Sequence, residues 1–232
     1  MKKLFILFFG ILAIYLSASQ AQNIFNSGDP EHKEIVVLLH GLARSNAAMW
    51  LLNMRLKHAG YHVETVGYRS LNRTPQQIVD DISQQIDLCS KGKANKIHFV
   101  GHSLGGLLIR AYLQNSDVRN LGRVVLVGTP NQGTEVADHF KDKWWAKIAG
   151  PTALSLGTGE GSFPKTLDDP YYPVGVIAGV SQNDNDHILP GLDDGLVSVE
   201  STKVNNMNDF VIVYSGHSMM RYNEDVADQT IH

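Results

Sequence analysis

Cysteine is nearly absent from this sequence, which contains a single one, Cys89, among 232 residues. One cysteine cannot form an internal disulfide, so the fold depends on its packed core even in an oxidising compartment. Cys89 shares one face of a predicted helix with Ile78, Ile82 and Ile86. That position indicates a small buried residue. A cysteine nucleophile would need a basic partner, which this stretch lacks.

The sequence also lacks an excess of charge of one sign, because 20 basic and 23 acidic residues leave a formal net charge of -3. This balance gives no electrostatic basis for nucleic-acid binding. Fixed-period repeats and low-complexity tracts are missing as well, which argues against a solenoid or long linkers. With 43% hydrophobic residues, the length fits one globular domain with a buried core.

The N-terminal segment, residues 1–21, has the three parts of a secretory signal peptide. A basic start is followed by an almost wholly apolar run, Leu4 to Leu16, and then by small residues. Ser19 and Ala21 fit cleavage after Ala21. An uncleaved membrane anchor is the alternative, although an apolar run of about 13 residues is short for a span, which needs about 20. The sequence therefore predicts an exported protein, periplasmic or secreted, with residues 22–232 as the mature domain.

Strand-like runs rich in Val, Ile and Leu alternate with helical segments along the mature chain. The predicted strands are residues 34–41, 61–68, 96–101, 123–130, 173–179 and 209–216. The predicted helices are residues 47–60, 74–92, 107–114 and 223–232. This alternation predicts an α/β fold with a mostly parallel, doubly wound sheet. The carboxyl ends of the strands then lie on one edge, where ligands bind in such sheets.

One segment, residues 131–173, interrupts the alternation. It is too long for a plain connection, which usually takes about 2–6 residues in α/β units. Apolar residues recur every four positions in it, at Val136, Phe140, Trp144 and Ile148. This spacing predicts an amphipathic helix that ends at Gly150. We expect a short cap-like insertion beside the ligand edge, and an ordinary helix packed on the core is the alternative.

Residues 101–105, Gly-His-Ser-Leu-Gly, match the G-x-S-x-G pattern between a predicted strand and a predicted helix. In this nucleophile elbow the serine sits on a strained turn with its hydroxyl above the sheet edge. Gly101 and Gly105 then avoid collisions with neighbouring elements. The pattern is no phosphate-binding loop, because no lysine follows the glycines. We interpret Ser103 as a nucleophile and His102 as a structural residue.

A serine hydroxyl needs a base, and the base needs an orienting carboxylate. In this type of fold the chain order is serine, acid, histidine. His217 follows the last predicted strand, where a loop brings an imidazole back over Ser103. We therefore prefer it as the base over the other later histidines, which are His139, His187 and His232.

The acid is expected in the loop after the strand at residues 173–179. Asp194 stands before a glycine and a short apolar segment that would hold it rigidly, so it is the preferred acid. Asp193 is the first alternative, and Asp184 and Asp186 are the others. The stretch "NDNDH" around the last two is typical of an Asx-rich turn. It lacks the full ligand spacing of a calcium site, so no metal is expected.

An oxyanion hole needs backbone N–H groups aimed at the developing charge. The N–H of Leu104 lies at the start of the helix after the serine. The N–H of Leu42, in the stretch "LLHGLARS", is the second predicted donor. Gly41 allows close approach of that loop, and His40 precedes the serine and is expected to shape the loop.

These motifs occur in one order: "HGLARS", "GHSLGG", "GTPNQGT", "DDGLVSVES" and "SGHSMM". In this they resemble the α/β-hydrolase fold of lipases and esterases over essentially all of the mature chain. The set is most similar to the short bacterial lipase-like proteins grouped with GPI-inositol-deacylase-like and triacylglycerol lipase domains. The resemblance implies Ser103 as nucleophile, Asp194 as acid and His217 as base. It also implies Leu42 and Leu104 as oxyanion donors.

We expect a serine carboxylester hydrolase that acts on acyl-ester or lipid substrates through an acyl-enzyme, without a cofactor. The aromatic side chains of Phe140, Trp144 and Trp145 are expected to line an acyl site or, when exposed, to contact a membrane surface. An acyltransferase or amidase with the same triad is one alternative. A non-catalytic scaffold that binds a lipid or a partner protein is another.

This interpretation makes a geometric prediction about residues far apart in the chain. Ser103, His217 and Asp194 must lie within hydrogen-bond reach of one another, at about 2.6–3.2 Å between successive partners.

Overall fold

The computed structural model describes residues 34–90, 94–143, 150–181 and 188–232. The predicted signal peptide, residues 1–21, lies outside them. The chain divides into two units, and the second, Lys33–His232, holds all the described residues. Among the described residues, no helix is both long enough and apolar enough to cross a membrane.

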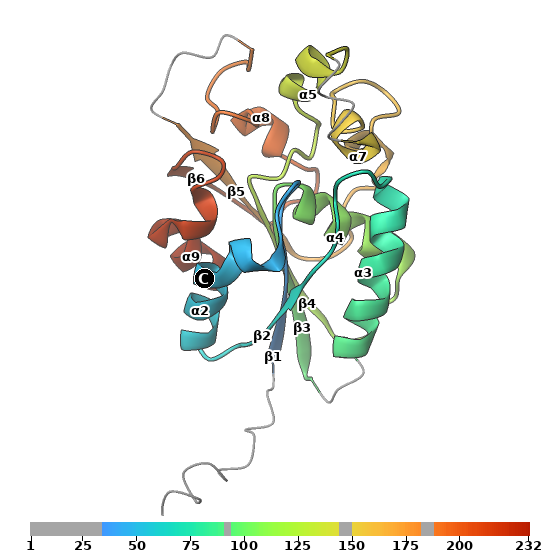
Figure 1. Ribbon diagram of the computed structural model, residues 1–232. Helices are drawn as coiled ribbons and strands as arrows, with labels where there is room; N and C mark the ends of the chain where they lie inside the picture. Colours follow the sequence, from blue (N-terminus) through green and yellow to red (C-terminus); the bar gives the residue numbers. More distant parts are fainter. Residues whose placement is uncertain (1–33, 91–93, 144–149, 182–187) are drawn as a thin grey trace, which may run out of the picture. The chain divides into compact units, whose positions relative to one another are not determined.

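The described strands form one six-stranded sheet in which every neighbouring pair is parallel (Figure 1). They are β1 (Glu34–Leu39), β2 (His62–Val66), β3 (Lys96–His102), β4 (Leu121–Val127), β5 (Val174–Val180) and β6 (Asp209–Tyr214). Their order is β2-β1-β3-β4-β5-β6, which places β3 and β4 at the centre. The predicted strands and the doubly wound parallel sheet are confirmed.

Helices cover both faces of the sheet, with α3 and α4 on one face and α2 and α9 on the other (Figure 1). The helices are η1 (Asn46–Met49), α2 (Trp50–His58), α3 (Pro75–Ser90), α4 (Leu104–Asn115), α5 (Glu135–Phe140), α7 (Pro151–Leu154), η2 (Phe163–Thr166), α8 (Val199–Thr202), η3 (Met220–Tyr222) and α9 (Glu224–Ile231), where η marks a 3₁₀ helix. The helices α5, α7 and α8 gather at the carboxyl end of the strands (Figure 1).

Strand periodicity explains why the two large apolar cores of the described residues lie on opposite faces of the sheet. Val37 and Leu39 of β1 pack into the core that contains α3 and α4, whereas Val36 and Leu38 pack into the core with α2 and α9. Successive side chains of a strand point to opposite faces, so a continuous apolar run fits a strand buried on both sides.

The N-terminus of α3 has a reciprocal cap formed by Thr74 and Gln77, at the residue where the sequence predicts that the helix begins. The Gln77 N–H donates to Thr74 Oγ1 at 3.3 Å, and the Gln77 Oε1 atom accepts from the Thr74 N–H at 3.0 Å. Such a capping box satisfies two N–H groups that a helix start leaves free. Pro75 fits the first turn because it has no N–H to lose.

The buried face of α3 carries Ile78, Ile82 and Ile86, as predicted. Cys89 lies one turn further on and is only half-buried, so the expectation of a buried cysteine is wrong. The pKa of its thiol is raised mainly by partial burial and also by the negative charge of Glu64. This shift favours the unreactive protonated form.

The segment 131–173 contains α5, α7 and η2, and its first helix is shorter than predicted. Thr134 caps α5 by accepting a hydrogen bond from the Val136 N–H, but α5 ends at Phe140 instead of continuing to Gly150. Residues 141–143 are polar and exposed, so no apolar contact is available there to hold another turn. Residues 144–149 lie outside the described residues.

Replacing Ile82 by Ala should test the core beneath α3. Its side chain has no exposed surface, so we expect a loss of about 2–5 kcal/mol in the free energy of unfolding. Leu88→Ala on the same helix is the control, because Leu88 is 68% exposed and should change stability by about 0.5 kcal/mol or less. Urea denaturation followed by circular dichroism measures both. Equal losses would contradict the packing described here.

Candidate active site

Ser103 occupies the turn between β3 and α4 with φ 58° and ψ -126°. A positive φ is costly for a residue with a side chain, and such strain persists only where the surrounding structure enforces it. A Cβ added at Gly101 would lie 2.5 Å from the Gly106 nitrogen, and one at Gly105 would lie 2.6 Å from the His40 oxygen. Both glycines are therefore steric requirements of the turn, as the sequence pattern indicates.

His217 reaches back over Ser103 from the loop after β6. Its Nε2 atom accepts from Ser103 Oγ at 2.9 Å, and its Nδ1–H donates to Asp194 Oδ2 at 2.7 Å. The His217 backbone N–H also donates to the Asp194 carbonyl at 2.8 Å. Both side-chain distances fall in the predicted range. Because a carboxylate accepts from Nδ1, the lone pair of Nε2 faces the serine hydroxyl.

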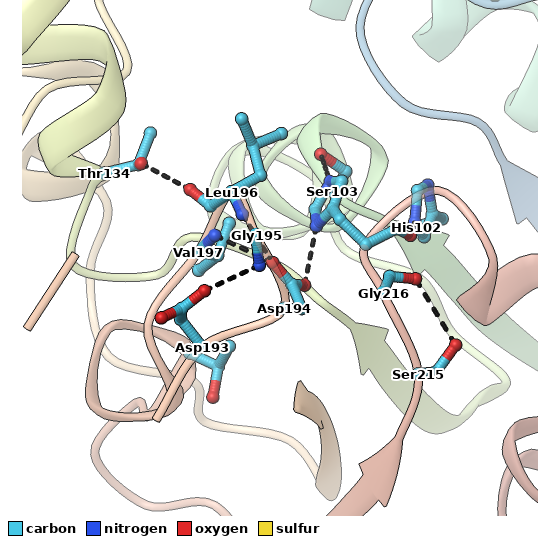
Figure 2. A network of polar contacts seen from close by, with 12 residues as sticks. His102, Ser103, Thr134, Asp193, Asp194, Gly195, Leu196, Val197, Ser215 and Gly216 are labelled. Carbon is cyan, nitrogen blue, oxygen red and sulfur yellow. Dashed lines mark hydrogen bonds and ion pairs between the residues drawn. The ribbon is translucent and has the colours of Figure 1, made fainter. Parts of the chain in front are cut away.

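The Asp194 carboxylate is held by the backbone of its own loop (Figure 2). Its Oδ1 atom accepts from the N–H groups of Leu196 at 3.0 Å and Val197 at 2.8 Å, which leaves Oδ2 for His217. Asp193 caps the Gly195 N–H instead. The structure thus selects Asp194 over Asp193 as the partner of His217, and Asp184 and Asp186 lie outside the described residues.

The segment after β4, which carries the motif "GTPNQGT", anchors the loop after β5 that carries Asp194 (the acid loop). The motif alone did not indicate this contact. Thr134 Oγ1 donates to the Leu196 carbonyl at 2.6 Å (Figure 2). Ser201 in α8 donates from Oγ to the Gly133 carbonyl and accepts at its own carbonyl from the Gln132 N–H. These bonds tie the segment after β4 to both sides of the acid loop.

Two glycines beneath the Asp194–His217 pair were missed by the sequence analysis. A Cβ at Gly128, which has φ +55°, would lie 2.9 Å from Met220 Sδ and 3.3 Å from Asp194 Oδ2. A Cβ at Gly179 would lie 2.9 Å from the Asp194 Cβ. Gly179 stands at the end of a predicted strand, and Gly128 stands two residues before the end of another. This position was the only available signal, since the neighbours they accommodate are distant in the chain.

The two predicted oxyanion donors flank Ser103. Leu104 is the first residue of α4, and Leu42 follows Gly41, whose added Cβ would lie 3.1 Å from the Ser103 Cβ. Neither N–H donates to any described residue, whereas the next one, that of Ala43, donates to Ser70 Oγ. An N–H at a helix start beside a nucleophile is suited to an anion.

His40 and His102 are both buried and serve the architecture, as predicted. The His40 Nδ1–H donates to the Gly41 carbonyl at 2.8 Å, and its ring stacks on Tyr68 with 4.0 Å between centroids. The His102 Nε2–H donates to the His217 carbonyl at 2.9 Å. Burial lowers the pKa of His40. The pKa of His102 is lowered to about 3, mainly by burial and also by the charge of His217.

Of the three aromatic residues predicted to bind the acyl chain, the described part of the chain includes Phe140. Phe140 is half-buried at the end of α5, where its ring meets His139 edge-on. Trp144 and Trp145 lie outside the described residues. A cavity of about 510 Å³ between the sheet and the ends of α2 and α9 is lined by none of the triad residues. The acyl site therefore stays a prediction.

Three comparisons place the chain among known proteins. A family model described as palmitoyl protein thioesterase matches residues 35–163. Mature Bacillus licheniformis lipase BlEst2 has a TM-score of 0.73 at 19% identity, over 89% of this chain and 94% of its own. A lipase-esterase related protein from Clostridium acetobutylicum has a TM-score of 0.60 at 16% identity, over 88% of this chain and 95% of its own. The Exiguobacterium antarcticum esterase EaEST has a TM-score of 0.57 at 16% identity, over 85% of this chain and 90% of its own.

No curated protein sequence matches the chain. Similarities at these identities show the fold, and the predicted α/β-hydrolase fold is confirmed by them.

His102 should make the stability of the folded protein depend on pH. Its pKa of about 3 in the folded protein is below about 6.5 for an unfolded histidine. Between these values the unfolded chain binds a proton that the folded protein excludes, so stability falls as pH falls. Urea unfolding at pH 6.5 and 4.5 should show wild type losing about 2 kcal/mol more than His102→Gln. Identical losses in both proteins would show that His102 titrates normally.

Proposed function

The chain belongs to the palmitoyl protein thioesterase family, and we propose that it is an exported serine hydrolase of hydrophobic acyl esters and thioesters. The observation that carries this proposal is the hydrogen-bonded series Ser103 Oγ, His217 Nε2, His217 Nδ1 and Asp194 Oδ2, at 2.9 and 2.7 Å. Nucleophile, base and orienting acid are defined by such geometry rather than by position in the sequence.

In the first half of the reaction, Ser103 Oγ attacks the acyl carbonyl carbon while His217 Nε2 takes the hydroxyl proton. The carbonyl oxygen becomes an oxyanion that accepts from the N–H groups of Leu42 and Leu104. The bond to the leaving group then breaks, and His217 returns the proton to the departing alcohol or thiol. Asp194 stabilises the imidazolium that exists between the two proton transfers.

In the second half, water replaces the leaving group. His217 takes a proton from the water as its oxygen attacks the acyl-Ser103 carbonyl, and then returns it to Ser103 Oγ as the acid is released. Each oxyanion donor contributes about 10²–10³ in rate where such donors have been removed singly. The strained Ser103 turn and the backbone hydrogen bonds to the buried Asp194 carboxylate hold these groups in place before substrate binds.

Several observations favour a hydrophobic acyl group. The matched family is named for palmitoyl thioesters, and the similar solved structures are lipases and esterases. The sequence places three aromatic residues, Phe140, Trp144 and Trp145, in the segment expected to form the cap, and aromatic side chains suit an acyl chain or a membrane surface. A thioester needs no change in the mechanism, because a thiol is a better leaving group than an alcohol.

Export is proposed from the N-terminal segment. The basic, apolar and small-residue parts of residues 1–21 support cleavage after Ala21. Expression of the full chain in a bacterial host, followed by N-terminal sequencing of the periplasmic and secreted protein, should give a chain that begins at Gln22. A membrane-bound protein that keeps Met1 would instead establish the anchor.

Reaction with a fluorophosphonate probe should test the nucleophile. We expect wild type to be labelled and Ser103→Ala to be unlabelled, with hydrolysis of p-nitrophenyl and acyl-thioester substrates lowered by about 10³–10⁶-fold. Ser83→Ala is the matched control, because its hydroxyl bonds only to Val79 within α3. Folded wild type that resists labelling and hydrolysis would favour the non-catalytic binding scaffold. Faster product formation with an added alcohol acceptor would identify acyl transfer.

A further inference from the structure

Ala43 has an unusual backbone conformation directly after the predicted oxyanion donor Leu42. Its φ is +53°, in the left-handed region that residues with a Cβ rarely occupy. Such strain at an exposed loop residue persists only where other contacts enforce it, and it concentrates at functional sites. The bend at Ala43 fixes the direction in which the loop leaves Leu42, so the cause of the bend bears on the oxyanion hole.

The loop after β2 supplies that cause. The Ala43 N–H donates to Ser70 Oγ at 2.8 Å, and Ser70 is buried. The Tyr68 hydroxyl donates to the His40 carbonyl. Two hydroxyl groups from one neighbouring loop thus hold the segment from His40 to Ala43 at both of its ends.

The ring of Tyr68 also supports the segment by packing. It stacks on the His40 imidazole with 4.0 Å between centroids and 9° between planes. Both rings are buried, and burial strongly raises the pKa of the Tyr68 hydroxyl. The neutral hydroxyl therefore stays a donor to the His40 carbonyl.

The same segment also packs closely against the residue that follows the other predicted donor. The His40 carbonyl lies 2.6 Å from the position that a Gly105 Cβ would occupy, at the start of α4. Leu104, whose N–H is the second donor, directly precedes Gly105. The position of the segment therefore sets the separation between the two N–H groups.

We propose that Tyr68 and Ser70 are positioning residues that hold the N–H of Leu42 in the oxyanion hole. The inference rests on the proposed function and adds two residues to it that do not touch the substrate. Preorganised donors stabilise a transition state because they need no reorganisation during the reaction. A displacement of about 1 Å in such a site costs up to about 10² in rate.

Tyr68→Phe and Ser70→Ala test the proposal, since each removes one hydroxyl and little volume. Tyr112→Phe and Ser83→Ala are the matched controls. The Tyr112 hydroxyl donates to Asp87 and the Ser83 hydroxyl to Val79, both within the layer of α3 and α4. All four variants, with wild type, are measured for kcat and KM on a neutral p-nitrophenyl ester and for the midpoint of thermal unfolding.

A transition-state analogue separates positioning from general loss of structure. Ser103 Oγ adds to the carbonyl carbon of a trifluoromethyl ketone with the same acyl chain, its proton passes to His217, and the ketone oxygen becomes an oxyanion. An ether of the same chain length has no carbonyl group and cannot form this adduct. We expect Tyr68→Phe and Ser70→Ala each to lower kcat by about 10-fold or more, with KM little changed. Affinity for the ketone should fall by the same factor, and affinity for the ether should not.

Three results would overturn the inference. One is an unchanged kcat in both variants. Another is a loss of ether affinity equal to the loss of ketone affinity, which would indicate a disturbed acyl site. The third is an equal loss of kcat in the matched controls, which would indicate general destabilisation. A wild-type protein that resists fluorophosphonate labelling would contradict the proposed function itself, and labelled wild type with unaffected variants would contradict only the positioning role.

Discussion

The site depends on the close approach of α4 to the ends of β1 and β3. This contact forces Ser103 into a positive φ and leaves no room for a Cβ at Gly101 or Gly105. The apolar core offsets the backbone strain at Ser103 because it fixes the position of α4 against the strands. Leu104 and Leu107 at the start of α4 are fully buried in it. Packing of the core therefore fixes the turn that presents the serine hydroxyl at the sheet edge.

Loops that follow different strands meet at this edge and are joined to one another by buried polar contacts. The acid loop after β5 is bonded to the segment after β4 through Thr134. The loop after β6 is bonded to the acid loop through Asp194 and to β3 through His102. Each of these groups would be costly if left unpaired in the interior. A change in one loop therefore affects its neighbours, which is why residues that never meet substrate contribute to the geometry.

The histidines show how environment assigns roles to identical side chains. His102 and His217 lie 5.0 Å apart between ring centroids, yet only His217 has the serine on one nitrogen and a carboxylate on the other. His102 is desolvated and neutral, and it donates to the His217 backbone. A second charge beside His217 would oppose the imidazolium that the proposed mechanism forms, and burial prevents it.

The sequence by itself determined the alternation of strands and helices, the nucleophile elbow and the order of serine, acid and histidine. Apolar periodicity and glycine sterics are local properties, so they can be read without a structure. Tertiary structure decided between Asp193 and Asp194, ended α5 at Phe140, and brought Gly128, Tyr68 and Ser70 to the site. These outcomes depend on contacts between segments far apart in the chain, which no local pattern encodes.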